Sequence, residues 1–196
     1  MINKIRCGWC GTVEETPLYV AYHDNEWGRP LHDEHKLFEF LILEGAQAGL
    51  SWYTVLKKRE NYRAAFDSFD PAKVALYDDV KIAELLTNEG IIRNRLKVHS
   101  AVRNAKVFLE IAEKNGSFDK FIWNYVGGKP IVNAWKRVED IPATSDISDK
   151  ISKDLKKLGM NFVGSTIIYS FMQATGMVND HLVDCFVSAE LTGGKI

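Results

Sequence analysis

Apolar residues recur along this 196-residue chain at helical spacing, and no segment alternates with the period of two that half-buried strands show. Asp33 is a candidate N-cap for the first long helix, and Asp70 followed by Pro71 is a typical helix start. After this first helix, further helices are predicted over residues 51–65, 71–77, 79–86, 91–114, 118–126, 148–158 and 165–175, with a short last one from Asn179–Asp180 through Cys185. The pattern predicts an all-α fold without internal repeats.

Composition sets the limits of this fold. With 46% hydrophobic residues, the chain can bury one core, and we expect a single domain over residues 1–196, folded as two lobes. The net charge is −1, so a polyanionic partner requires a local basic patch. No run of eighteen apolar residues occurs and Met1–Arg6 lacks an apolar signal region, so we expect a soluble, cytoplasmic protein that does not enter a membrane.

The stretch from Leu37 to Trp52 carries the first candidate site. Glu44 follows four apolar residues and stands at the edge of the helix face that should be buried. Small residues, Leu50 and Trp52 come next. A carboxylate beside small residues and a tryptophan is suited to a pocket for a flat, cationic ligand, whereas the alternative is a helix end at which Glu44 reaches solvent. The spacing alone does not decide between them.

A second stretch, residues 18–28, is rich in aromatic residues and ends in polar ones. Tyr19 and Tyr22 are three residues apart, so one helical turn would bring both rings to one side. They are either part of a binding site or ordinary core and boundary aromatics.

Cysteine and histidine residues at both ends of the chain form a candidate metal site. Cys7 and His23 lie near the front, and His181 and Cys185 lie four residues apart near the back, where one helix would place them on one face. Thiolates with imidazoles suit tetrahedral Zn²⁺, and four protein ligands make a structural site. The spacing is not a compact metal motif, and Cys10 is a fifth candidate, so ordinary packing remains the alternative. An odd number of cysteines argues against a disulfide framework.

The turn from Gly159 to Gly164 separates two predicted helices, and residues 148–176 read as a helix-hairpin-helix element. Glycines at both ends allow backbone N–H groups to face outward at the start of the second helix, where phosphate oxygens bind favourably. Lys156 and Lys157 precede the turn. The element is suited to the DNA backbone, although a plain αα-hairpin has the same pattern. Residues 91–109 contain lysine and arginine residues and no acidic ones. They form either a basic face that contacts DNA or an ordinary helix face exposed to solvent.

Taken together, these motifs resemble the 3-methyladenine DNA glycosylases of the constitutive bacterial type. The resemblance covers nearly the whole chain in the right order. It is carried by Cys7-Gly8-Trp9, Tyr19-x-x-Tyr22-His23-Asp24-x-Glu26-Trp27-Gly28, Leu43-Glu44-x-x-Gln47-Ala48-Gly49-Leu50-Ser51-Trp52, Lys57-Lys58-Arg59-Glu60-Asn61-Tyr62-Arg63, Gly90-Ile91-Ile92-Arg93, and Val178-Asn179-Asp180-His181 with Cys185.

The resemblance implies a helical bundle of the helix-hairpin-helix glycosylase superfamily, with its terminal segments tied by one structural Zn²⁺. The implied zinc ligands are Cys7, His23, His181 and Cys185. The implied base pocket has Glu44 as its catalytic carboxylate and five aromatic residues: Tyr22, Trp52, Trp9, Tyr19 and Trp27. Gly49 and Leu50 would occupy the gap in the duplex, and the backbone contacts would come from Gly159, Gly164, Ser165, Lys156 and Lys157.

The implied activity is excision of N3-methyladenine from double-stranded DNA by a monomeric enzyme, with free 3-methyladenine as product. Most superfamily members carry an aspartate where this chain has Asn179, and Asp180 is one residue out of register. We therefore expect monofunctional hydrolysis in which Glu44 recognises the positive charge of the base more than it transfers a proton. Two other classes stay open: a non-catalytic helical DNA-binding protein, and a thiol-redox protein based on Cys7-x-x-Cys10.

Overall fold

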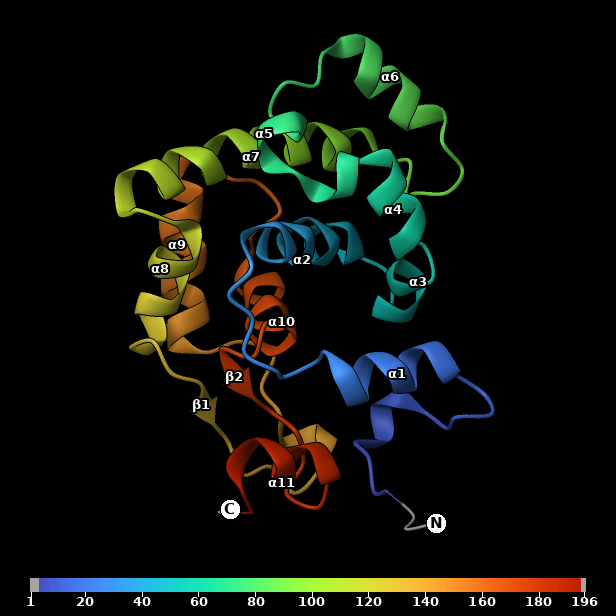
Figure 1. The fold of residues 1–196 in the computed structure, drawn as a ribbon, viewed down its shortest axis with the longest axis vertical. Helices are drawn as coiled ribbons and strands as arrows, with labels where there is room; N and C mark the ends of the chain where they lie inside the picture. Colours follow the sequence, from blue (N-terminus) through green and yellow to red (C-terminus); the bar gives the residue numbers. More distant parts are fainter. Residues whose placement is uncertain (1–3, 195–196) are drawn as a thin grey trace.

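A computed structural model describes residues 4–194 of the chain, and these residues are mostly helical (Figure 1). The outermost residues of the predicted domain, 1–3 and 195–196, lie outside the described part, as does half of the Met1–Arg6 segment. The α-helices are Pro17–Asn25 (α1), Glu34–Gln47 (α2), Trp52–Leu56 (α3), Arg59–Ala65 (α4), Pro71–Val74 (α5), Asp79–Thr87 (α6), Arg95–Asn115 (α7), Phe118–Trp123 (α8), Asp146–Leu158 (α9), Ser165–Ala174 (α10) and Phe186–Thr192 (α11). In residues 4–194, no helix combines the length and the apolar character that a membrane crossing requires.

Helix α2 is the centre of the molecule. Asp33 caps it as predicted, because its side chain accepts a hydrogen bond from the backbone N–H of Lys36 at 2.9 Å. All residues from Leu37 to Ala46 are buried. Figure 1 shows α2 between helices α4–α7 on one side and α10 on the other, while α1 and α11 lie at the end that holds both termini. The helix therefore lies in the core, with other helices packed on both of its sides.

Several predicted helix boundaries are confirmed and others are shifted. Asp70 caps α5, with Pro71 as its first residue, and Asp78 caps α6. The predicted helix 51–65 is divided at Lys57–Lys58 into α3 and α4. Helix α9 begins earlier than predicted, because Ser145 and Ser148 form a reciprocal capping box.

Two further boundaries are shifted in the middle of the chain. The predicted helix 91–114 begins only at Arg95, where the Asn94 side chain accepts from the backbone N–H of Lys97. The predicted helix 118–126 ends as a 3₁₀ turn over Asn124–Val126.

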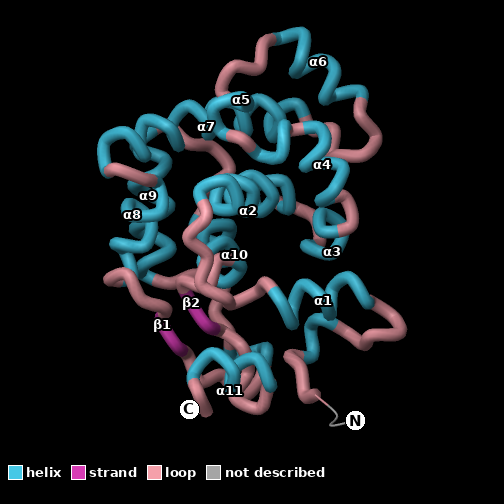
Figure 2. The backbone as a smooth tube through the Cα atoms, viewed as in Figure 1, coloured by secondary structure: helices cyan, strands magenta, loops and turns pink. Residues whose placement is uncertain are grey.

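The C-terminal segment corrects the prediction of a purely helical chain. Ile131–Val132 (β1) and Val178–Asn179 (β2) form a two-stranded parallel ladder, shown in magenta in Figure 2. The predicted short helix from Asn179 through Cys185 is wrong, because Asn179 is in this ladder and α11 starts only at Phe186. The four-residue spacing of His181 and Cys185 therefore belongs to a turn and not to one helical face.

Candidate active site

A cavity of about 320 Å³ opens between α1, α2, α3, α10 and the segment around residues 138–142. The residues that line it are Trp9, Tyr19, Tyr22, Trp27, Glu44, Gln47, Trp52, Val138, Ile141, Pro142, Ser170 and Gln173. We call it the aromatic cavity. It gathers the carboxylate and all five aromatic side chains that the sequence motifs implied. The other six residues were not predicted.

Glu44 lies in the last turns of α2 and is 4% exposed. The helix-end alternative, in which Glu44 reaches solvent, is therefore wrong. Burial raises its pKa to about 8, because an anion loses its hydration there. In residues 4–194, neither Glu44 Oε2 nor the indole Nε1 of Trp52 has a hydrogen-bond partner. Unpaired buried polar atoms are costly, so the cavity presents an acceptor and a donor suited to a polar ligand.

The aromatic side chains form two groups around the cavity. The Trp9 ring centroid lies 4.9 Å from that of Tyr19 and 4.9 Å from that of Trp27. The rings of Tyr22 and Trp52 are 5.4 Å apart and inclined at 45°. These rings and the buried carboxylate thus line one cavity, which suits a flat ligand that carries positive charge.

An ion-pair network supports this wall from behind. The Arg59 guanidinium lies 4.9 Å from the Phe40 ring centroid, and Phe40 stacks against Trp52 at 6.2 Å. Arg59 is buried and donates to the carboxylates of Glu39 and Glu26. Because both partners of each buried charge are present, the network can hold the Phe40 and Trp52 rings in a fixed position.

The turn after α2 presents the predicted wedge. Gly49 has a φ of +81°, which a glycine adopts without strain, and Leu50 after it is 42% exposed. The backbone N–H of Leu50 donates to Gln47 O at 2.6 Å. Lys97, predicted as part of a basic face, instead donates from Nζ to Ala46 O at 2.8 Å and to Ala48 O at 2.7 Å.

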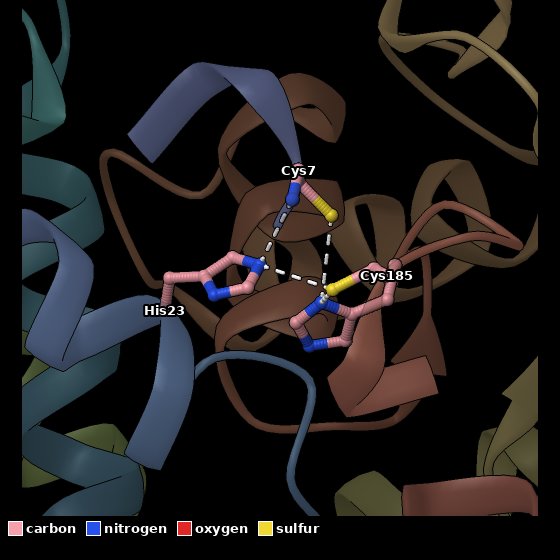
Figure 3. A group of neighbouring side chains, drawn as sticks. Cys7, His23 and Cys185 are labelled. Atoms are coloured by element: carbon pink, nitrogen blue, oxygen red, sulfur yellow. Dashed lines mark hydrogen bonds between the residues drawn. The ribbon is translucent and has the colours of Figure 1, made fainter. Parts of the chain in front are cut away.

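The four predicted metal ligands meet in one buried cluster, and Figure 3 labels three of them, Cys7, His23 and Cys185. One ligand atom from each of Cys7, His23, His181 and Cys185 lies within 4.8 Å of the others. Cys7 Sγ is 3.6 Å from His181 Nδ1, and Cys185 Sγ is 3.5 Å from both His181 Nδ1 and His23 Nε2. Zn–S and Zn–N bonds at a tetrahedral angle give an S···N edge of about 3.6 Å. The cluster could therefore hold a metal ion.

The outer ring nitrogens of the cluster are also paired. His23 Nδ1 lies 2.8 Å from Asp24 Oδ1, and His181 Nε2 lies 2.9 Å from the backbone oxygen of Trp27. Such contacts fix the ring orientation of a metal-binding histidine. A Cβ atom at Gly28 would stand 2.8 Å from His181 Nε2, so this close approach requires a glycine. The cluster is thus directly connected to Trp27, a wall of the aromatic cavity.

Cys10 is buried next to the cluster but not among its ligands. Its thiol donates to the backbone oxygen of Cys7 at 3.1 Å, and burial raises its pKa to about 11. A raised pKa opposes the thiolate chemistry that a redox motif needs. All three cysteines are free thiols in the described part of the chain.

The predicted hairpin, residues 159–164, joins the packed helices α9 and α10. Gly159 ends α9 in the left-handed conformation and Gly164 caps α10. Lys156 and Lys157 are exposed in the last turn of α9. The Ser165 hydroxyl, at the start of α10, lies 2.8 Å from that of Ser148.

Helix α7 fixes the hairpin from the inside. Arg103 Nε donates to Gly159 O at 2.5 Å, and the side chain of Asn104 pairs with the backbone of Asn161 at 2.9 Å in both directions. Arg103 is thus not a free member of a basic face. Its role is to hold the hairpin that was predicted to meet DNA.

The class that the fold and the site define is a helical protein with a buried carboxylate inside an aromatic cavity, and with a separate hairpin between two packed helices. The chain belongs to the methyladenine glycosylase family, whose model matches residues 9–188. This confirms the family resemblance that the sequence motifs indicated.

Named relatives agree with this assignment. The chain is 52% identical to DNA-3-methyladenine glycosylase 1 of Escherichia coli (strain K12), over 92% of this chain and 95% of that protein. It is 48% identical to DNA-3-methyladenine glycosylase of Haemophilus influenzae, over 92% and 96%. The structure describing 3-methyladenine recognition by the Staphylococcus aureus 3-methyladenine DNA glycosylase I superposes with a TM-score of 0.89 at 41% identity, covering 93% of this chain and 96% of that one.

Proposed function

We propose that this protein releases 3-methyladenine from alkylated double-stranded DNA by hydrolysing the N-glycosidic bond, as a monofunctional glycosylase without a lyase step. Its family and the names of its relatives support this activity. The observation that carries the proposal is the buried carboxylate of Glu44, with one oxygen unpaired, inside an aromatic cavity of about 320 Å³. The whole chain, residues 1–196, acts as one glycosylase domain in this proposal.

Charge explains why the cavity suits this base. Adenine methylated at N3 within DNA is formally cationic, and a cation over an aromatic face gains about 0.5–2 kcal/mol. Burial makes ionised Glu44 unfavourable, as its raised pKa shows, and a cationic base next to the carboxylate offsets that penalty. Neutral adenine gives no such compensation. Glu44 therefore recognises the positive charge, and its free oxygen accepts a hydrogen bond from the base edge.

The reaction needs little acid–base assistance. A water molecule attacks C1′, the C1′–N9 bond breaks with its electron pair going to the base, and the water loses a proton to solvent. The cationic base leaves as neutral 3-methyladenine. The described residues that line the aromatic cavity include no lysine, which agrees with hydrolysis and not with Schiff-base chemistry.

Access to the base requires its extrusion from the duplex. Leu50, exposed on the turn after Gly49, fills the space that the base leaves and offsets part of the unstacking cost of a few kcal/mol. The backbone N–H groups at the start of α10, from Gly164 and Ser165, and the lysines at the end of α9 bind phosphates without reading sequence. The hairpin acts in this proposal as the helix-hairpin-helix element.

One structural Zn²⁺ ion per chain is the cofactor in this proposal. The S···N distances of 3.5–3.6 Å and the soft donor set of two cysteines and two histidines fit tetrahedral zinc. Four protein ligands leave no open position for a substrate, so the ion serves stability. The ion would link the N- and C-terminal segments. Because His181 also contacts the backbone oxygen of Trp27, this link would stabilise one wall of the cavity.

Base release from alkylated DNA, with 3-methyladenine and 7-methylguanine measured separately, tests the proposal. Glu44→Gln should lower 3-methyladenine release roughly 10- to 100-fold, the loss expected for a hydrogen bond to a charged group. Unchanged kinetics would remove Glu44 from the site. The exposed Glu110→Gln on α7 serves as a matched control.

Wild-type protein that binds DNA but releases neither base would be the non-catalytic DNA-binding protein that the sequence left open. The thiol-redox alternative would be supported only by reversible oxidation of Cys7 and Cys10. We propose that the enzyme acts as a monomer in the cytoplasm, where bacterial DNA is accessible, and light scattering of the purified protein tests the monomer.

A further inference from the structure

A fully buried carboxylate, Asp180, lies next to the cluster and outside the aromatic cavity. Two donors reach its Oδ1 atom at 2.7 Å each: Asn133 Nδ2 and Trp135 Nε1. Two more reach Oδ2 at 2.8 Å each: the Tyr169 hydroxyl and Gln173 Nε2. Four donors satisfy a buried carboxylate, and such a group holds its partners in defined orientations.

Gln173 is the partner that also lines the aromatic cavity. A carboxylate paired in this way only accepts hydrogen bonds, so the amide NH₂ group of Gln173 must face Asp180. The amide oxygen then lies on the other side of the side chain, and in residues 4–194 it has no hydrogen-bond partner. The backbone oxygen of Gln173 accepts from the N–H of Gly28 at 2.9 Å, which fixes the main chain at this position.

The same carboxylate organises a second part of the cavity. Asn133 and Trp135 stand at the start of the irregular segment whose later residues, Val138 and Ile141, line the cavity. The cavity-lining part of this segment is a short 3₁₀ turn, Val138–Asp140, and Asn133 and Trp135 tie the residues before it to Asp180. Asp180 therefore fixes both the Gln173 amide and the segment that faces it.

We infer that the Gln173 amide oxygen, oriented by Asp180, accepts a hydrogen bond from the exocyclic amino group of the flipped base and so selects adenine over guanine. This rests on the function proposed above. An amino group offers two N–H donors, one for Glu44 and one for Gln173. 3-Methylguanine carries a carbonyl oxygen at that position, which would face two acceptors and leave them unpaired. Gln173 is a specificity-determining residue and Asp180 is a positioning residue.

Gln173→Met tests the inference, because it keeps the length of the side chain and removes the acceptor. Release of 3-methyladenine and 3-methylguanine is measured from the same alkylated duplex. We expect kcat/KM for 3-methyladenine to fall roughly 10- to 100-fold, as for a lost hydrogen bond in a buried site, while 3-methylguanine release is unchanged or rises. A merely structural role would lower both in proportion, and an unchanged ratio overturns the inference.

Asp180→Asn is the second variant, in case Gln173→Met does not fold. It removes the negative charge that fixes the amide and allows Gln173 to turn over, so the ratio of the two released bases should move in the same direction. Thermal unfolding of each variant shows whether it is folded. A wild-type protein that releases no 3-methyladenine would overturn the proposed function itself, which is a different result from an unchanged ratio in an active enzyme.

Discussion

The side-chain ammonium of Lys97 donates a 2.7 Å hydrogen bond to the backbone oxygen of Ala48, the residue before Gly49 and Leu50. A second bond reaches Ala46 O at 2.8 Å. The C-terminus of α2 thus has a cation on its unpaired carbonyl groups, where the helix dipole favours positive charge. Burial lowers the pKa of Lys97. Lys97, on α7, therefore fixes the turn that carries the proposed wedge residue, Leu50.

Lys97→Met is expected to lower excision from duplex DNA about tenfold or more, because a mobile Leu50 fills the vacated space poorly, which costs on the order of 1.4 kcal/mol or more. Binding of free 3-methyladenine, measured by tryptophan fluorescence, should change little, since the aromatic cavity keeps its lining residues. Lys106→Met, at an exposed position of the same helix, is the matched control. Equal losses of free-base binding and excision would show that Lys97 supports the cavity as a whole.

Glu44 makes folding stability depend on pH. Its folded pKa of about 8 lies above the ordinary value of 4.5, so the folded protein retains a proton that the unfolded chain releases. Stability is therefore lost as pH rises from about 4.5 to about 8. Glu44→Gln lacks this loss and should gain stability relative to wild type with increasing pH, by at most about 1.4 kcal/mol per pH unit. Urea unfolding at pH 5 and 8 measures the difference, with Glu110→Gln as control; parallel curves would contradict a buried, partly neutral Glu44.

Removal of the metal is expected to lower the stability of the folded protein. Cys10 is not a ligand in the proposed site, so its replacement should not have this effect. Metal analysis should find one zinc ion per chain, and Cys185→Ser should lower both zinc content and unfolding temperature. The free energy of unfolding should fall by several kcal/mol, since zinc binding contributes about 10–16 kcal/mol in small zinc-finger peptides. Cys10→Ser is the matched control, because its thiol donates to the backbone oxygens of Cys7 and Gly11 and is not one of the four cluster ligands. A metal-free wild type of equal stability would contradict the zinc proposal.

Replacement of Lys156 and Lys157 by glutamine should weaken DNA binding uniformly across sequences. For each phosphate that the variant no longer neutralises, the slope of log affinity against log salt should fall by roughly 0.9. Lys73→Gln combined with Lys114→Gln, both at exposed positions on other helices, makes the same change in net charge and is the control. A slope equal to that of wild type would count against binding of phosphate by the hairpin lysines.

The site residues that belong to compact sequence motifs could be predicted. Those that reach the cavity from segments without a recognisable motif could not. Glu44 and the five aromatic residues belong to three short motifs, around Trp9, around residues 18–28 and around residues 37–52, and the family resemblance of these motifs indicated their role where spacing alone left it open. Gln173 and Ile141 reach the cavity from α10 and from an irregular segment, and no periodicity marks their direction. Only the tertiary fold brings them together.

Helix boundaries show the same division. Caps such as Asp33 and Asp70 are local hydrogen-bonding devices and could be predicted. The ladder of β1 and β2 could not, because two residues on each side have no pattern of their own and their pairing depends on a partner 47 positions away, as in Ile131 with Val178. Because Asn179 pairs with Val132, the helix predicted to begin at Asn179 does not form, and His181 and Cys185 precede α11.

The Cys/His cluster joins positions that are 174 residues apart, Cys7 and His181. During synthesis, the first two ligands exist long before the last two have been made. The complete set of ligands therefore exists only after synthesis has reached Cys185, and a metal bound by all four could not guide the folding of the segments made before it. A chain interrupted before His181 would lack both C-terminal ligands of the cluster and also the contact between His181 Nε2 and the backbone oxygen of Trp27, a residue of the cavity wall.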